Sequence, residues 1–260
     1  MSQPKGYASA ELLQSLTKMA QQAKQRSYTH MHIQPGHKVL DVGCGPASDT
    51  LAIAQLLGTT GQVIGIDYDE AMIIEANQRV EQAGVGILVK HRQADAAALP
   101  YESEEFDSSR SERLFQHLLN PEQALVEMVR VTKTGGWIVV MDTDWGTLSF
   151  DTSEVDIERR LARVLAERCF HNGYSGRQLY RLFKRQNLAD ISIEVFPTFV
   201  TDYSLWRQAS LLDRAEQEAL SEGIITNEEL QHWHTSLEHA SAEDVFFGMG
   251  CMVLVVGRKI

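Results

Sequence analysis

The chain has 260 residues, of which 43% are hydrophobic, and its formal net charge is -11 at pH 7; this composition fits one large domain with a sizeable core. No cluster of Lys and Arg offsets the acidic charge, so we expect no nucleic-acid partner, because such binding requires cations against the phosphates. The longest apolar run (252–257) is too short to span a bilayer, the N-terminal region has no apolar signal segment, and the three cysteines lack CxxC spacing, so we expect a cytoplasmic protein without membrane insertion or disulfides.

The first 143 residues are predicted to alternate between helices and strands. An amphipathic helix is expected over 9–28. Strands follow at 35–43, 61–67, 85–95, 106–112 and 137–143, with helices at 48–58, 69–84 and 120–136. Asp69 and Asn120 are placed to cap two of these helices, and Gly84 and Gly135 to end them. Strands that alternate with helices indicate a parallel sheet covered on both faces.

The pattern changes after residue 150. Helices are predicted at 154–170 and 176–188, then a strand at 191–201, helical stretches from 204 to 240 and a last strand at 244–259. We therefore expect a single α/β domain over 1–260. Residues 200–244 are expected to form a helical insertion that caps the substrate side, and residues 1–30 an N-terminal helical lid.

Three acidic residues follow the first three predicted strands. Asp41 ends the first strand, directly before Gly43 and Gly45, Asp67 ends the second, and Asp95 follows the third. Ligands of open α/β sheets bind outside the carboxyl ends of the strands. We therefore expect the three carboxylates to line one crevice.

These carboxylates favour a ligand with a ribose, an adenine and a cation. A carboxylate can accept bonds from both ribose hydroxyls, a second can accept from the adenine amine, and a third, at the glycine turn, attracts a cation. S-adenosylmethionine has all three features. A nicotinamide dinucleotide would bring its pyrophosphate against Asp41, and its fingerprint is incomplete because Ser48 takes the third small position. An NAD(P)-dependent oxidoreductase is therefore the less favoured alternative.

Five segments, in this order, resemble the class I S-adenosylmethionine-dependent methyltransferases. They read VLDVGCGPASD, VIGID, QADAAALPYESEEFD, ERLFQHLLNPEQALVEMVRVTKTGG and VVMDTDWGTL. The resemblance is to the small-molecule group that includes ubiquinone, menaquinone and natural-product methyltransferases, and it covers roughly residues 36–147. It implies a Rossmann-like sheet of seven mostly parallel strands, with an antiparallel last strand and helices on both faces.

The resemblance also implies which residues bind the cofactor. They are Asp41, Gly43, Cys44 and Gly45 around the methionine part, Asp67 at the ribose, Tyr68 and Met72 against the adenine, Asp95 and Ala96 at the adenine edge, and Ser111 and Glu112 near the methyl group. The acceptor is expected to be a small molecule whose O, N or C nucleophile takes the methyl group in line. One departure from the family pattern is the pair Ser108 and Ser109, in a strand expected to be central and apolar.

A catalytic base is harder to predict, because alignment and exclusion of water are the main tasks in this reaction. His117 could act as a general base, although a histidine bonded to backbone beneath the cofactor is the favoured interpretation. Asp142 and Asp144 lie where some relatives hold a divalent cation, but no third ligand follows, so no metal is predicted. A regulatory S-adenosylmethionine-binding protein, or one with a different reaction, remains an alternative.

Overall fold

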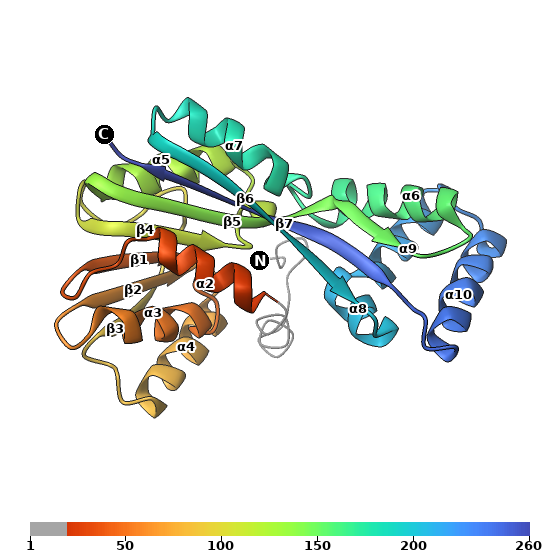
Figure 1. Cartoon of the computed structure of the whole chain (residues 1–260), viewed down its shortest axis with the longest axis horizontal. Helices are drawn as coiled ribbons and strands as arrows, with labels where there is room; N and C mark the ends of the chain where they lie inside the picture. Colours follow the sequence, from red (N-terminus) through yellow and green to blue (C-terminus); the bar gives the residue numbers. More distant parts are fainter. Residues whose placement is uncertain (1–19) are drawn as a thin grey trace.

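A computed structural model describes residues 20–260 as a seven-stranded sheet with helices around it (Figure 1). The strand order is β3-β2-β1-β4-β5-β7-β6. The strands are β1 (Lys38–Val42), β2 (Gln62–Asp67), β3 (Val89–Gln93), β4 (Phe106–Glu112), β5 (Thr132–Phe150), β6 (Ala189–Val200) and β7 (Gly248–Arg258). Only β7, among these, runs antiparallel to both of its neighbours. The predicted fold class is confirmed.

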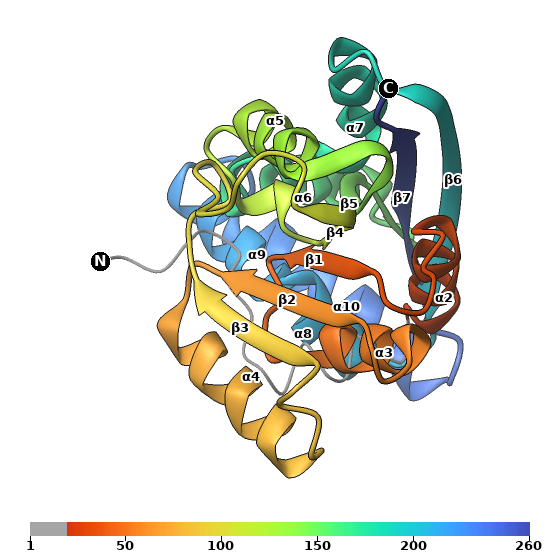
Figure 2. The same ribbon diagram turned by 90° about the vertical axis from the view of Figure 1, so that its left-hand side faces the viewer.

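Helices cover both faces of this sheet. The described helices are α2 (Gln21–His30), α3 (Ser48–Leu57), α4 (Glu70–Gln82), η1 (Phe115–His117), α5 (Pro121–Val131), α6 (Val155–Val164) with its π-helical continuation η2 (Leu165–Cys169), α7 (Ser175–Arg185), α8 (Tyr203–Ser210), α9 (Leu212–Ser221) and α10 (Asn227–Ala242), of which α6 and α8 to α10 lie away from these faces. Apolar side chains of α2, α3 and α4 pack on one face, and those of α5 and α7 on the other. Figure 2 shows these two layers from the end of the sheet.

The predicted helix starts are confirmed by their caps. The Asp69 side chain accepts a bond of 2.8 Å from the amide of Ala71, and Asn120 accepts one of 3.1 Å from the amide of Gln123. Each bond satisfies an amide that has no partner inside its own helix. The part of the predicted 9–28 helix that precedes residue 20 lies outside the described residues, as does the same part of the expected lid.

The fifth strand is much longer than the predicted 137–143. It starts at Thr132, so α5 ends at Val131 instead of running to residue 136, and it continues to Phe150. Thr132 pairs with Phe106 of β4, and the antiparallel ladder with β7 extends the other end to Phe150 opposite Gly248. Pairing between segments a hundred residues apart leaves no local signal in the sequence.

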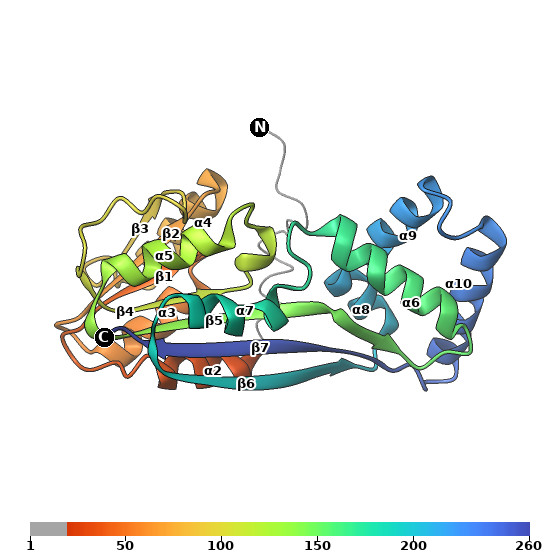
Figure 3. The same cartoon turned by 90° about the horizontal axis from the view of Figure 1, so that it is seen from above.

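The extended ends of β5, β6 and β7 lead to a second lobe, which we call the cap (Figure 3). It contains α6, α8, α9 and α10, whose apolar residues form one cluster with fully buried Trp233 and Leu237. Helices α8 to α10 correspond to the expected insertion at 200–244, whereas the participation of α6 was not expected. That this lobe closes over a substrate stays a prediction.

The two serines of β4 are accommodated by hydrogen bonds. The Ser108 hydroxyl donates to the carbonyl of Trp137 (3.0 Å), and the Ser109 hydroxyl lies 2.8 Å from that of Thr132. Buried hydroxyls with partners avoid most of the cost of leaving water. The next residue, Arg110, is 1% exposed and belongs to a buried charge cluster described below.

Candidate functional site

A cavity of about 1020 Å³ opens at the carboxyl ends of β1, β2 and β4 and extends to the cap. This volume is at the upper end of the ~300–1,000 Å³ typical of small-molecule sites. Its wall combines the turn after β1, the ends of β2 to β4, and residues of the cap. Both lobes therefore contribute to one site.

The turn after β1 is built around two glycines with left-handed backbone. Gly43 has φ +77° and Gly45 φ +51°, a region that side chains with a Cβ disfavour. A Cβ on Gly43 would also lie 3.0 Å from Cβ of Leu114. The amides of Gly43 and Cys44 both donate to the carbonyl of Ile66 (2.8 Å), which fixes the turn to β2.

Asp67 connects this turn to the start of α4. Its Oδ2 accepts from the amide of Gly45 (3.0 Å) and its Oδ1 from the amide of Asp69 (2.9 Å). Burial raises the pKa of the Asp67 carboxyl, and the amide donors oppose that shift. The N-cap of α4 is Asp69, so the Asp67 carboxylate is not needed to cap this helix.

Most of the predicted cofactor residues meet at this cavity. Those that line it are Gly43, Cys44, Gly45, Asp67, Tyr68, Met72, Asp95, Ala96 and Glu112, together with His117. Met72 is 7% and Tyr68 58% exposed, so an apolar and an aromatic surface flank the end of β2. Asp41 and Ser111 are buried and do not belong to the lining.

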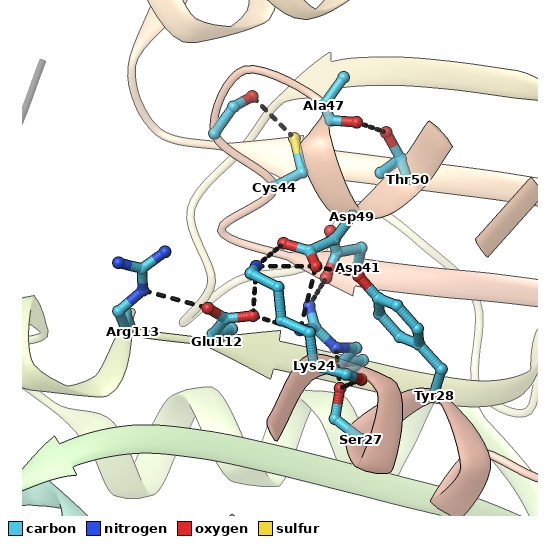
Figure 4. Close-up of polar contacts among 12 residues, drawn as sticks. Lys24, Ser27, Tyr28, Asp41, Cys44, Ala47, Asp49, Thr50, Glu112 and Arg113 are labelled. Carbon is cyan, nitrogen blue, oxygen red and sulfur yellow. Dashed lines mark hydrogen bonds and ion pairs between the residues drawn. The ribbon is translucent and has the colours of Figure 1, made fainter. Parts of the chain in front are cut away.

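Asp41 lies inside a cluster of buried charges instead (Figure 4). Its carboxylate accepts from Arg110 (3.2 Å), whose guanidinium also pairs with Asp49 and Glu112. Burial raises the pKa of Asp41 to about 7, although the Arg110 charge acts in the opposite direction. One carboxylate oxygen, Oδ2, has no partner among residues 20–260. The expected position of Asp41 at the mouth of the turn is therefore not what the structure has.

Lys24, for which no role was predicted, connects this cluster of charges to the cavity wall. Lys24 Nζ lies 2.9 and 2.7 Å from the two oxygens of Asp49 and 2.6 Å from Oε2 of Glu112. All three residues line the cavity. Burial disfavours the ionised forms of Asp49 and Glu112, but neighbouring Arg110 and Lys24 lower the pKa of both. The position of this lysine on the apolar side of the first predicted helix was the sequence feature that could have indicated a buried partner.

The surroundings of His117 orient its ring. Gln116 Oε1 accepts from the indole N–H of Trp145 (2.7 Å), so Gln116 Nε2 is the donor end of that amide. This Nε2 lies 3.1 Å from Nε2 of His117. A donor there requires His117 Nε2 to accept, which assigns the ring proton to Nδ1. Nε2 of this histidine is thus engaged by a protein amide rather than open to a substrate proton.

The two acids that the sequence placed at the end of the fifth strand lie within β5 and have protein partners. Asp142 is fully buried and accepts from the amides of Gln116 and Thr143, and burial raises the pKa of its carboxyl to about 7. Asp144 accepts from Arg177. Within residues 20–260, no three His, Cys, Asp or Glu side chains are grouped to hold a metal ion. No helix of that part is long and apolar enough to cross a membrane.

Comparisons with known proteins agree with this architecture. A family model described as "Methyltransferase domain" matches residues 33–187. An uncharacterised 37.1 kDa protein in transposon TN4556 of Streptomyces fradiae is 32% identical over 85% of this chain and 63% of its own length. A demethylmenaquinone methyltransferase of Bacillus mycoides is 36% identical over 45% of this chain and 49% of its own. The chain thus spans about half to two thirds of the curated relatives it matches.

A solved structure has the same fold along most of the chain. The YcgJ protein of Bacillus subtilis superposes with a TM-score of 0.66 at 19% identity, covering 92% of this chain and 98% of that one. At this identity the likeness concerns the fold, and a fold by itself does not select a reaction.

Proposed function

The chain belongs to the methyltransferase-domain family, and from this premise we propose that it transfers the methyl group of S-adenosylmethionine to an O, N or C nucleophile of a small molecule. The observation that carries the proposal is the charge of the cavity wall. Among residues 20–260, seven lining residues have carboxylates (Asp49, Asp67, Asp69, Glu70, Asp95, Glu112 and Asp144), and two are Lys or Arg (Lys24 and Arg113). Such a wall favours a ligand with cationic groups and disfavours the pyrophosphate of a dinucleotide.

The residues present fit the cofactor in three places. Asp67 stands at the end of β2 with oxygens already held by two amides, which orients it for the ribose hydroxyls. Met72 and Tyr68 offer surfaces for the adenine, and Asp95 and Ala96 lie on the same wall. At the other end, Asp49 and Glu112 replace Asp41 as the carboxylates nearest to an ammonium group, with Lys24 beside them for a carboxylate.

The cofactor supplies an electrophilic methyl group on a sulfonium. The tasks left to the chain are to hold the acceptor in line and to exclude water. The cap-side residues Trp145, Leu148 and Phe170 contribute an apolar surface to the same cavity as the glycine turn, and the ring of Phe170 stacks on Trp145 at 4.7 Å. We do not propose that Nε2 of His117 acts as a general base, because it already accepts a hydrogen bond from Gln116. The proton on Nδ1 makes that nitrogen a hydrogen-bond donor.

A calorimetric titration tests the cofactor. S-adenosylmethionine and S-adenosylhomocysteine should bind, and NADH should not. A screen of acceptors with methyl-labelled cofactor then tests the transfer. Binding of NADH without any response to S-adenosylmethionine would overturn the proposal, and cofactor binding without transfer to any acceptor would favour the regulatory alternative.

A further inference from the structure

The cap contributes a wall of a different kind from the cofactor side. We define the cap-side wall as the cavity-lining residues between 143 and 252. Its large side chains are Trp145, Leu148, Phe170, Trp206, Leu211 and Met252. All of them except Trp145 and Leu211, which are half-buried, are less than 9% exposed. This surface suits an apolar ligand with flat parts, because aromatic rings stack on one another.

Charge is almost absent from the cap-side wall. The described residues in it include no Lys or Arg, Asp144 is the one carboxylate, and His171, whose side chain is exposed, is the one histidine. That carboxylate is already paired with Arg177, which does not line the cavity. Phosphate and carboxylate ligands are held in proteins by Arg, Lys or convergent amides. The two cations of the cavity, Lys24 and Arg113, lie on the cofactor side, each in contact with Glu112.

Resting on the proposed function, we infer that the methyl acceptor is a neutral, largely apolar ring or isoprenoid compound, without a phosphate or carboxylate group. A phosphorylated acceptor would exchange its hydration for an apolar surface, in a cavity whose described lining has more carboxylates than Lys and Arg side chains, with Arg110 and Arg177 balancing only Asp49, Glu112 and Asp144. Among the described residues of the cap-side wall no Lys or Arg compensates this change, and His171 is exposed to solvent. When a neutral, largely apolar acceptor binds, mainly apolar surface is removed from water, which is favourable.

Matched probe pairs test this inference on the full-length protein saturated with S-adenosylhomocysteine. We would titrate 1-naphthol against 1-naphthyl phosphate, and geraniol against geranyl phosphate, by calorimetry. At least one neutral compound should bind, and each neutral compound that binds should do so about tenfold or more tightly than its phosphate, which corresponds to ~1.4 kcal/mol. A phosphate that binds as tightly as its neutral partner, or binding by neither neutral compound, would overturn the inference.

A variant with an added cation provides the matched control. Ala209 lines the cavity from α8 and is half-buried, so a flexible side chain can enter there. Ala209→Lys should reduce the preference for the neutral probes by about tenfold, and Ala209→Gln, similar in size but uncharged, should leave it in place. An equal effect of both variants would mean that shape rather than charge selects the ligand, which contradicts the inference. Failure of S-adenosylhomocysteine to bind at all would instead refute the proposed function.

Discussion

The two sides of the cavity differ in how they are made. The cofactor side is polar. The glycine turn and Asp67 lie at the ends of β1 and β2, Lys24 and Asp49 come from α2 and α3, and the charges are held by amides and ion pairs. The cap side is mostly apolar, and its large side chains come from β5, α8, β7 and the segments after η2 and α8, which lie far apart in the chain. The end of a sheet can hold charged groups at fixed positions, whereas an apolar wall recognises a ligand through the fit of its surface alone. We therefore expect that substitutions on one side change the affinity for the ligand of that side and leave the affinity for the other ligand nearly unchanged.

The strongest way to break the cofactor side is to remove Arg110. Arg110→Met leaves Asp41, Asp49 and Glu112 without their shared buried cation, and removing one partner of a buried pair costs about 3–5 kcal/mol. Urea denaturation should measure this loss of unfolding free energy. Arg185→Met, at an exposed pair with Glu122, should change it by less than about 1 kcal/mol. If Arg110→Met has the same free energy of unfolding as the parent protein, the stabilising role assigned to the cluster is wrong.

The corresponding change on the cap side is Leu237→Ala. Leu237 is fully buried in the cap cluster, so the cavity left behind should cost about 2–5 kcal/mol. If the two sides are separable, hydrogen exchange should increase in α8 to α10 while the affinity for S-adenosylhomocysteine stays within twofold, about 0.4 kcal/mol. Leu56→Ala, at an exposed position of α3, should leave both measurements unchanged. A large fall in cofactor affinity in Leu237→Ala would show that the two sides are one unit.

Part of the pH dependence of stability can be assigned to His91 on β3, which contacts Thr50 of α3 and lies outside the cavity lining. Burial lowers the pKa of His91 from 6.5 to about 4 in the folded chain. Between these values the unfolded chain binds a proton on this histidine that the folded chain does not, so the contribution of His91 to stability falls as the pH drops below 6.5, whereas the raised pKa values of Asp41 and Asp142 act in the opposite direction. At pH 5 this amounts to about 2 kcal/mol. On going from pH 7 to pH 5, urea denaturation should show that the unfolding free energy of the parent chain falls by about 2 kcal/mol relative to that of His91→Gln; equal changes in the two proteins would contradict the assignment.

The smallest expected effect concerns cofactor affinity alone. Asp67→Ala should weaken S-adenosylmethionine at least about tenfold, or ~1.4 kcal/mol, because charge-assisted bonds to the ribose are lost. Some stability is lost too, since Gly45 and Asp69 lose an acceptor. Asp202→Ala serves as the control, because Asp202 caps α8 and its removal should cost about 1 kcal/mol of stability without affecting affinity. A destabilised Asp67→Ala protein that binds the cofactor normally would place the ribose elsewhere.

The sequence by itself determined the parts that depend on near neighbours in the chain. Strand and helix order, the caps at Asp69 and Asn120, and the glycine turn followed from periodicity and from residue types with specific backbone preferences. Asp67 and Asp95 reached the cavity as predicted, because the carboxyl ends of parallel strands meet at one edge of the sheet.

Only the tertiary structure decided which charges pair. Lys24 meets Asp49 and Glu112 across 25 and 88 residues of sequence, and Arg110 draws Asp41 away from the cavity wall. The length of β5 and the joining of α6 to the cap likewise depend on packing between distant segments. Ion pairs and strand ladders form between groups that are adjacent in space, and adjacency in space is a property of the folded chain that local sequence patterns do not contain.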